Sequence, residues 1–69
     1  MINYLIKNTI NDKYLTFNGQ VFSYTENVHN GYISSFTTEP EALKFVEDEL
    51  INSKGQYEVV GYNYAQEIL

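Results

Sequence analysis

The sequence predicts an α+β domain, with one amphipathic helix packed on one face of a small antiparallel sheet of about five strands. Short runs rich in tyrosine, phenylalanine and branched apolar residues recur along the chain, and polar turn signals such as Asn-Gly separate them. A single segment, "FTTEPEALKFVEDEL", has apolar residues at helical spacing. Neither a linker nor a repeat divides the 69 residues. We therefore expect one domain, residues 1–69, in the order β-β-β-β-α-β.

The strands are placed by β-favouring residues between turn signals. Asn18-Gly19 is the pair that a type I′ hairpin turn requires, because both central residues of that turn need a positive φ. Gly61 is expected to mark a bulge in the last strand. The expected strands are Ile2–Lys7, Tyr14–Phe17, Val21–Tyr24, Tyr32–Phe36 and Tyr57–Tyr64.

The helix is expected to begin after Thr38, because "TEPE" matches a capping box. In such a box Thr38 accepts from the amide of Glu41, the Glu41 carboxylate returns to the amide of Thr38, and proline is tolerated in the first turn. The helix should end near Ser53 to Gly55, with Gly55 as a left-handed cap. Helical projection gives an apolar face formed by Ala42, Leu43, Val46 and Leu50, with Phe45 and Ile51 at its edges.

Composition excludes several classes of protein. Apolar residues make up 43% of the chain and charged residues only 19%, a balance opposite to that of disordered segments. The opening residues do not resemble a signal peptide, and no apolar run is long enough to span a membrane. The chain has no cysteine, which favours a cytoplasmic setting. It has no arginine and a net charge of −5, which disfavours direct binding to nucleic acid.

No pattern of residues predicts catalysis, a metal site or a cofactor. His29 is the only histidine, and we expect it to be a solvated loop residue because no motif supplies it with a nucleophile and an orienting group. The serines lie outside any nucleophile elbow. Consecutive acidic residues on a helix diverge, so Glu47, Asp48 and Glu49 are not expected to bind a metal together. We therefore expect a protein that is not an enzyme.

Negative charge is concentrated in the helix. Residues 39–49 contain five acidic residues and one lysine, which is a net charge of −4 out of −5 for the whole chain. Glu41 has a structural reason for its position at the positive end of the helix dipole. Glu47, Asp48 and Glu49 oppose that dipole, and only a Lys44–Asp48 pair offsets them locally. Two interpretations stay open: the acidic residues keep the protein soluble, or they contact a basic surface of another protein.

The seven tyrosines also have two interpretations. Aromatic residues favour strands and fill a small core efficiently. Alternatively, Tyr57, Tyr62 and Tyr64 stand on an exposed face as interface anchors, because tyrosine combines apolar area with a polar tip.

The pattern "YLIKN…DKYLTFNG…FTTEPEALKFVEDEL…YEVVGY" resembles short proteins of unknown function carried by phages and prophages of low-GC Gram-positive bacteria. In those proteins a sheet meander leads into an F-x-T-x-E-E-A-like helix start and a closing Y-E-V-V strand. This chain has Pro40-Glu41-Ala42 where the pattern has E-E-A. The resemblance implies an inhibitor that acts in the cytoplasm of the host cell. Such phage proteins often block host enzymes, including restriction and CRISPR effectors.

These observations lead to one main functional hypothesis and one alternative. The first is a binding module that occupies a basic, nucleic-acid-binding surface of a host protein, with contacts from Glu41, Glu47, Asp48, Glu49 and the three tyrosines. The alternative is a structural or assembly protein that associates with itself through an exposed sheet edge or an aromatic face. The sequence identifies neither the target, nor the strand order, nor the oligomeric state.

Overall fold

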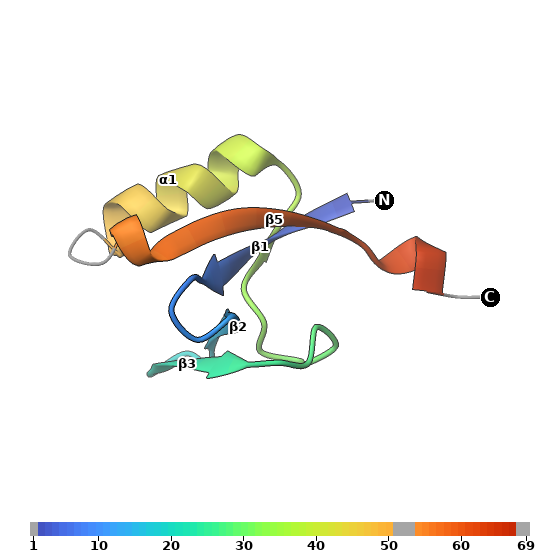
Figure 1. Ribbon diagram of the computed structural model, residues 1–69, viewed down its shortest axis with the longest axis horizontal. Coiled ribbons are helices and arrows are strands. Elements are labelled where there is room, and N and C mark those ends of the chain that lie inside the picture. The colour runs from blue at the N-terminus through green and yellow to red at the C-terminus, as the bar shows by residue number, and fades with distance from the viewer. Residues whose placement is uncertain (1, 51–53, 68–69) are drawn as a thin grey trace.

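The computed structural model describes residues 2–50 and 54–67, and it has the predicted α+β architecture (Figure 1). A five-stranded antiparallel sheet curves around one side of a single α-helix. The elements are β1 (Ile2–Asn8), β2 (Lys13–Phe17), β3 (Phe22–Thr25), β4 (Ser35–Phe36), α1 (Glu39–Glu49), η1 (Lys54–Gln56), β5 (Tyr57–Asn63) and η2 (Tyr64–Glu67).

β1 is the central strand, and both of its edges are used. It pairs with β5 along its whole length, with Leu5 opposite Val60. Its other edge is shared by two strands, since Lys7 pairs with Tyr14 of β2 and Leu5 pairs with Ser35 of β4. A strand that is covered on both faces should bury consecutive side chains. Leu5 and Ile6 are accordingly both fully buried.

The predicted strand Tyr32–Phe36 is shorter than expected, because its residues pair with two different strands. Ile33 forms an isolated bridge with Thr16, and the Ser34 amide donates to the Leu15 carbonyl at 3.0 Å. Only Ser35 and Phe36 then pair with β1 as β4. The registers of β2 with β1 stop at Tyr14, so this segment fills the space where those two strands separate.

The hairpin of β2 and β3 is present, but its predicted type I′ turn is wrong. The last strand pair is Phe17 with Phe22, which leaves a four-residue loop, and Gly19 has a φ of 96°. Asn18 does not share the positive φ that a type I′ turn needs. Instead, its side-chain Oδ1 accepts from the amides of Gln20 and Val21 at 2.9 and 3.0 Å. Asparagine therefore stabilises this turn through its side chain.

α1 begins as predicted and ends earlier than predicted. Thr38 is the N-cap in an extended conformation, and its side chain accepts from the Glu41 amide. The helix ends at Glu49 with Leu50 as its C-cap, so the predicted end near Ser53 to Gly55 is wrong. Gly55 lies in η1 without a positive φ and does not cap the helix. The last turn contains no basic residue, and acidic side chains there oppose the helix dipole and weaken any extension.

The core lies between α1 and the concave face of the sheet. Ile6, Leu15 and Val46 form its buried centre, and Ala42 of α1 is fully buried as well. Each large side chain removed from water contributes about 1.5–3 kcal/mol. Leu43 was predicted on the apolar face but is 47% exposed, and Phe45 packs against the core in its place. The predicted edge residue Ile51 lies outside the described residues.

Gly61 does not form the predicted bulge, because the register of β1 and β5 runs unbroken from Ile2–Asn63 to Asn8–Tyr57. Its role is one of space. A Cβ at Gly61 would meet Ile2 Cγ2 at 3.3 Å and the Tyr4 ring at 3.5 Å. Because Gly61 has no side chain, the Ile2 and Tyr4 side chains of β1 have room to lie against the backbone of β5.

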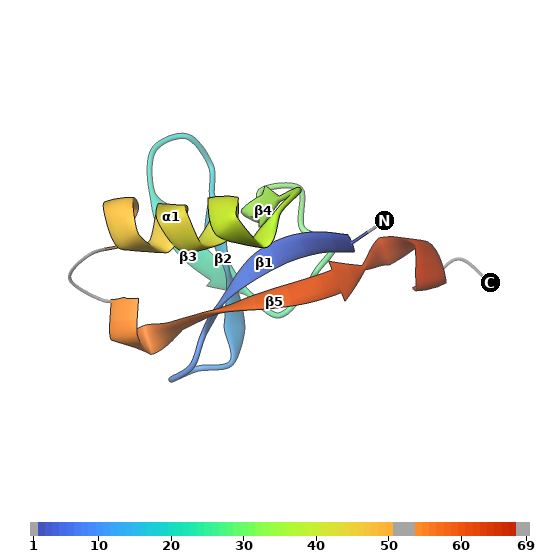
Figure 2. The ribbon, with the colours of Figure 1, turned by 90° about the horizontal axis from the view of Figure 1, so that it is seen from above.

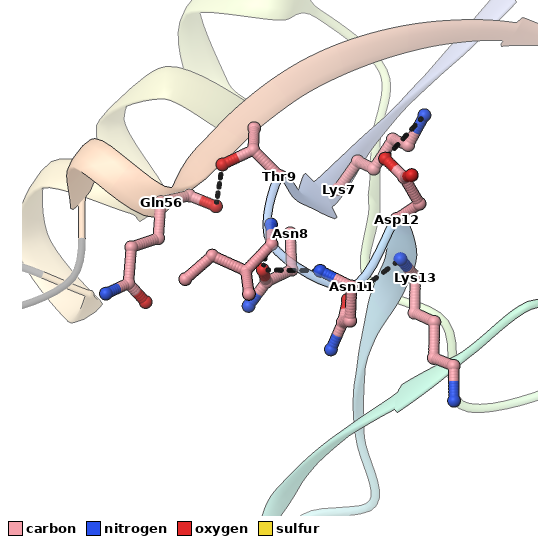
Figure 3. A network of polar contacts seen from close by, with 8 residues as sticks. Lys7, Asn8, Thr9, Asn11, Asp12, Lys13 and Gln56 are labelled. Atoms are coloured by element: carbon pink, nitrogen blue, oxygen red, sulfur yellow. Dashed lines mark hydrogen bonds and ion pairs between the residues drawn. The ribbon is translucent and has the colours of Figure 1, made fainter.

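The turn between β1 and β2 is held by a network of side-chain and backbone hydrogen bonds (Figure 3). The buried Asn8 side chain accepts from the Ile10 amide at 2.8 Å. The amide and hydroxyl of Thr9 both donate to the Gln56 carbonyl, at 2.7 and 3.1 Å. This network fixes the start of β5 against the end of β1, beside the C-terminal end of α1.

Candidate functional site

The first turn of α1 fixes the position of Glu41. Its carboxylate accepts from the hydroxyls of Thr38 and Thr37 at 2.8 and 3.1 Å. The predicted return bond to the Thr38 amide is replaced by these two hydroxyl bonds. A carboxylate at this end of a helix also meets the positive end of the dipole. Glu41 is exposed, so it is both part of the cap and accessible from outside.

The remaining acidic residues of α1 lie on two different sides of the helix. Asp48 and Glu49 line a shallow surface hollow together with Glu41, whereas Glu47 lies beside β5 in a second hollow with Leu43. The structure thus separates Glu47 from Glu41, Asp48 and Glu49 and places it beside Tyr57, which lines the second hollow as well. The first hollow, which we call the acidic hollow, is lined by Phe36, Glu41, Lys44, Phe45, Asp48 and Glu49.

No ion pair neutralises the acidic hollow from within. The predicted Lys44–Asp48 pair does not form, and the ion pair seen in residues 2–50 and 54–67 is that of Lys7 and Asp12, at 3.7 Å in the β1–β2 turn (Figure 3). Lys44 lines the hollow with three carboxylates, which leaves a net charge of −2 there. The hollow therefore attracts cations.

The floor of the acidic hollow continues into a row of aromatic rings. Phe36 and Phe45 are 5.4 Å apart between ring centroids, Phe45 and Phe22 are 6.1 Å apart, and Phe22 and Phe17 are 4.6 Å apart. All four phenylalanines of the chain form this row, which we call the phenylalanine strip. It begins between α1 and β4 and ends beside the loop of the β2–β3 hairpin, whose elements Figure 2 shows from above.

Sequence reasoning considered tyrosines as anchors and missed the phenylalanine strip. The available signal was the position of Phe17 and Phe22 on either side of the hairpin loop, because cross-strand neighbours in a hairpin share a face. The contacts of Phe22 and Phe36 with Phe45 join elements distant in the sequence, and no local pattern predicts them.

Tyr57, the first predicted anchor, lies at the edge of the core and is partly buried. Its hydroxyl shares a hydrogen bond of 2.5 Å with the Tyr24 hydroxyl of β3. Burial and this bond together raise the pKa of Tyr57 to about 12, although a hydrogen bond with Asn8 acts in the opposite direction. These contacts give Tyr57 a structural role between β5 and β3.

Tyr62 and Tyr64, the other two predicted anchors, lie together beyond the opposite face of β1. Their ring centroids are 4.8 Å apart, and the His29 ring is 5.6 Å from that of Tyr64. The Tyr64 hydroxyl donates to the Val28 carbonyl at 2.6 Å. Burial, with a smaller effect of nearby Tyr14, raises the pKa of Tyr64. This cluster holds the 26–31 loop against the sheet and does not meet the acidic hollow.

The described residues supply carboxylates, one lysine and aromatic rings to this surface. His29 is exposed and lies against an aromatic ring. The parts of the chain that the structure describes contain no group of three potential metal ligands and no helix long and apolar enough to cross a membrane. The acidic hollow and the phenylalanine strip together form the candidate site, a surface that is acidic at one end and apolar at the other.

Comparisons with protein-family models, with curated proteins and with solved structures found no match.

Proposed function

We propose that this protein is a non-enzymatic binding module whose acidic hollow contacts a basic surface of another protein. The observation that carries the proposal is the convergence of Glu41, Asp48 and Glu49 on one exposed, aromatic-floored hollow. Acidic residues retained only for solubility have no need to converge, because dispersed charges serve that purpose equally well.

The electrostatic cost of this arrangement supports the proposal. Asp48 and Glu49 lie in the last turn of α1, where negative charge opposes the helix dipole at a cost of about 0.3–1 kcal/mol each. Residues that break a local rule in this way often belong to a functional surface.

The partner surface that we propose is one that ordinarily binds nucleic acid. Such grooves are the commonest strongly basic surfaces in a cell, because they neutralise phosphates with Lys and Arg. An acidic protein bound in such a groove prevents nucleic acid from binding there. This role is the one implied by the resemblance to short phage and prophage proteins of unknown function, because phage proteins of this kind often block host enzymes, including restriction and CRISPR effectors.

A pair of charge reversals at neighbouring positions of α1, one inside the acidic hollow and one outside it, tests the proposal. Immobilised protein is exposed to lysate of a low-GC Gram-positive bacterium at low and at high salt, and retained proteins are quantified by mass spectrometry. We expect a partner that is retained at low salt, released at high salt and competed by DNA or RNA. Asp48→Lys should weaken retention severalfold, whereas Glu47→Lys, one residue away but outside the hollow, should not. Retention that ignores both salt and Asp48→Lys contradicts the proposal.

One observation favours a second candidate function, self-association. β5 pairs with β1 along one edge only, and its other edge has no strand partner within the described parts of the chain (Figure 2). A strand of seven residues with an open edge can pair with a second copy. Sedimentation at two protein concentrations tests this candidate, and a strict monomer at both concentrations eliminates it.

A further inference from the structure

We infer that the partner segment is amphipathic: its apolar side chains lie on the phenylalanine strip while its Arg or Lys side chains meet the carboxylates of the acidic hollow. This inference rests on the proposed function and specifies the chemistry of the partner. It starts from the outer end of the strip, Phe17 and Phe22, which the electrostatic proposal does not use.

The two rings at the outer end of the phenylalanine strip are exposed and in contact with each other. Phe17 and Phe22 are each 42% exposed, and Val21, next to Phe22 in the hairpin loop, is 59% exposed. Single exposed apolar residues are ordinary on a small protein. A connected set is different, because contiguous apolar patches mark surfaces that another molecule covers.

The stability of the hairpin accounts for only part of this surface. The cross-strand contact of Phe17 and Phe22 stabilises the β2–β3 pair. It does not explain Val21, whose side chain belongs to a loop already held by the Asn18 side chain. It also does not explain why the strip leads into the acidic hollow.

The negative charge of the acidic hollow determines which kind of partner can bind to this surface. Two copies facing each other through this surface bring their carboxylates together, and repulsion opposes that arrangement. Anionic lipid headgroups are repelled in the same way. A basic amphipathic segment satisfies both parts of the surface, because its cations pair with Glu41, Asp48 and Glu49 and can also lie over the ring of Phe45.

Synthetic peptides provide the test. ¹⁵N-labelled full-length protein is titrated with a helical Leu/Arg peptide and with an extended peptide in which Leu and Arg alternate. Two versions of each serve as controls, one with Leu replaced by Ser and one with Arg replaced by Glu. We expect at least one Leu/Arg peptide to shift the amides of Val21, Phe22, Phe45 and Asp48. The Leu→Ser version should bind about tenfold more weakly, and the Arg→Glu version should cause no shifts.

Variants of the protein then separate the strip from the hollow. Val21→Ser changes a loop side chain and should keep the fold, and Phe22→Ser removes the central exposed ring. Both should weaken the Leu/Arg peptide about tenfold. Ile10→Ser, at a 72% exposed position in the β1–β2 turn, is the matched control and should bind normally. Phe22→Ser should lower the melting temperature, because it removes the ring contacts with Phe17 and Phe45, so circular dichroism at the assay temperature establishes that each variant is folded.

The outcomes distinguish the two proposals. If the Leu→Ser peptides bind as well as the Leu/Arg peptides, or if Val21→Ser and Phe22→Ser bind normally, this inference is wrong and the electrostatic proposal stands. If neither Leu/Arg peptide binds, this inference is also wrong, and the lysate experiment decides the proposed function independently.

Discussion

Two residues show how strongly a single backbone or side-chain position is constrained in so small a protein. Gly19 occupies the left-handed region at φ 96° with open space around it, and Asn8 is a buried polar side chain in the β1–β2 turn. The first is a conformational requirement and the second a hydrogen-bonding requirement. Each gives a prediction with a different physical origin.

Replacing Gly19 by alanine should lower the free energy of unfolding by about 1–2 kcal/mol, because an L residue is strained at that φ even though no atom lies within 4 Å of the new Cβ. Gly31→Ala is the matched control. It also has open space and has no positive φ, so it should leave stability unchanged or raise it by a few tenths of a kcal/mol. Urea unfolding of the two variants measures the difference, and equal effects contradict the assigned turn conformation.

Replacing Asn8 by alanine should cost about 1–3 kcal/mol, because the amides of Ile10 and Asn11 lose the acceptor that the buried side chain provides. Asn11→Ala is the comparison, since its side chain accepts one bond, from the exposed Lys13 amide, and should cost less. Hydrogen exchange of the Ile10 amide should accelerate in Asn8→Ala and stay slow in Asn11→Ala. Unchanged exchange in Asn8→Ala contradicts this role.

At the scale of elements, the sequence predicted those features that depend on residues close together in the chain. The start of α1 follows from Thr38, Pro40 and Glu41, which lie within one turn of each other. The end of α1 was predicted too late, because Gly55 looked like a cap, whereas the helix ends at Glu49 with Leu50 as its C-cap, and Leu50 packs on the core. Likewise, the shortness of β4 depends on where β1 and β2 separate, which is a tertiary feature.

The candidate site shows the same division. The acidic residues of the hollow were visible in the sequence, and helical spacing alone places Glu47 away from Asp48. The aromatic floor was not visible, because Phe36 and Phe45 come from β4 and α1, and Phe22 reaches them from the hairpin. Tyr57, Tyr62 and Tyr64 look like anchors in the sequence, yet each has an intramolecular contact in the fold.

The N-cap of α1 gives a prediction at this scale. Thr38→Ala removes the acceptor for the Glu41 amide and one donor to the Glu41 carboxylate, so it should lower the free energy of unfolding by about 1 kcal/mol. Thr37→Ala removes only one exposed bond to the same carboxylate and should cost less than half as much. Circular dichroism during urea unfolding measures both values, and equal costs would show that Thr38 does not cap the helix.

At the scale of the whole molecule, hydrogen bonds of tyrosine hydroxyls connect segments that are distant in the sequence, on both faces of β1. On the side of α1, the Tyr57 and Tyr24 hydroxyls connect β5 to β3, which lie 33 residues apart in the sequence. On the other side, the Tyr64 hydroxyl connects the end of the chain to Val28, 36 residues away. No disulfide is available to a chain without cysteine, so long-range closure depends on such contacts and on the core.

The partly buried, hydrogen-bonded hydroxyl of Tyr57 predicts that the stability of the protein falls at high pH. Burial raises the pKa of Tyr57 to about 12, whereas a tyrosine in the unfolded chain titrates near its ordinary value of about 10. The contribution of Tyr57 to stability is therefore complete below about pH 10 and is lost as the pH rises toward 12, because the unfolded chain releases its proton first. The raised pKa of Tyr64 acts in the same direction.

Urea unfolding between about pH 9 and about pH 11.5 should show this decline. Tyr57→Phe should be less stable at neutral pH but should decline less steeply, whereas Tyr32→Phe, at an exposed position, should follow the unmodified protein. If Tyr57→Phe declines as steeply as the unmodified protein, the hydroxyl of Tyr57 is not the titrating group that links pH to folding.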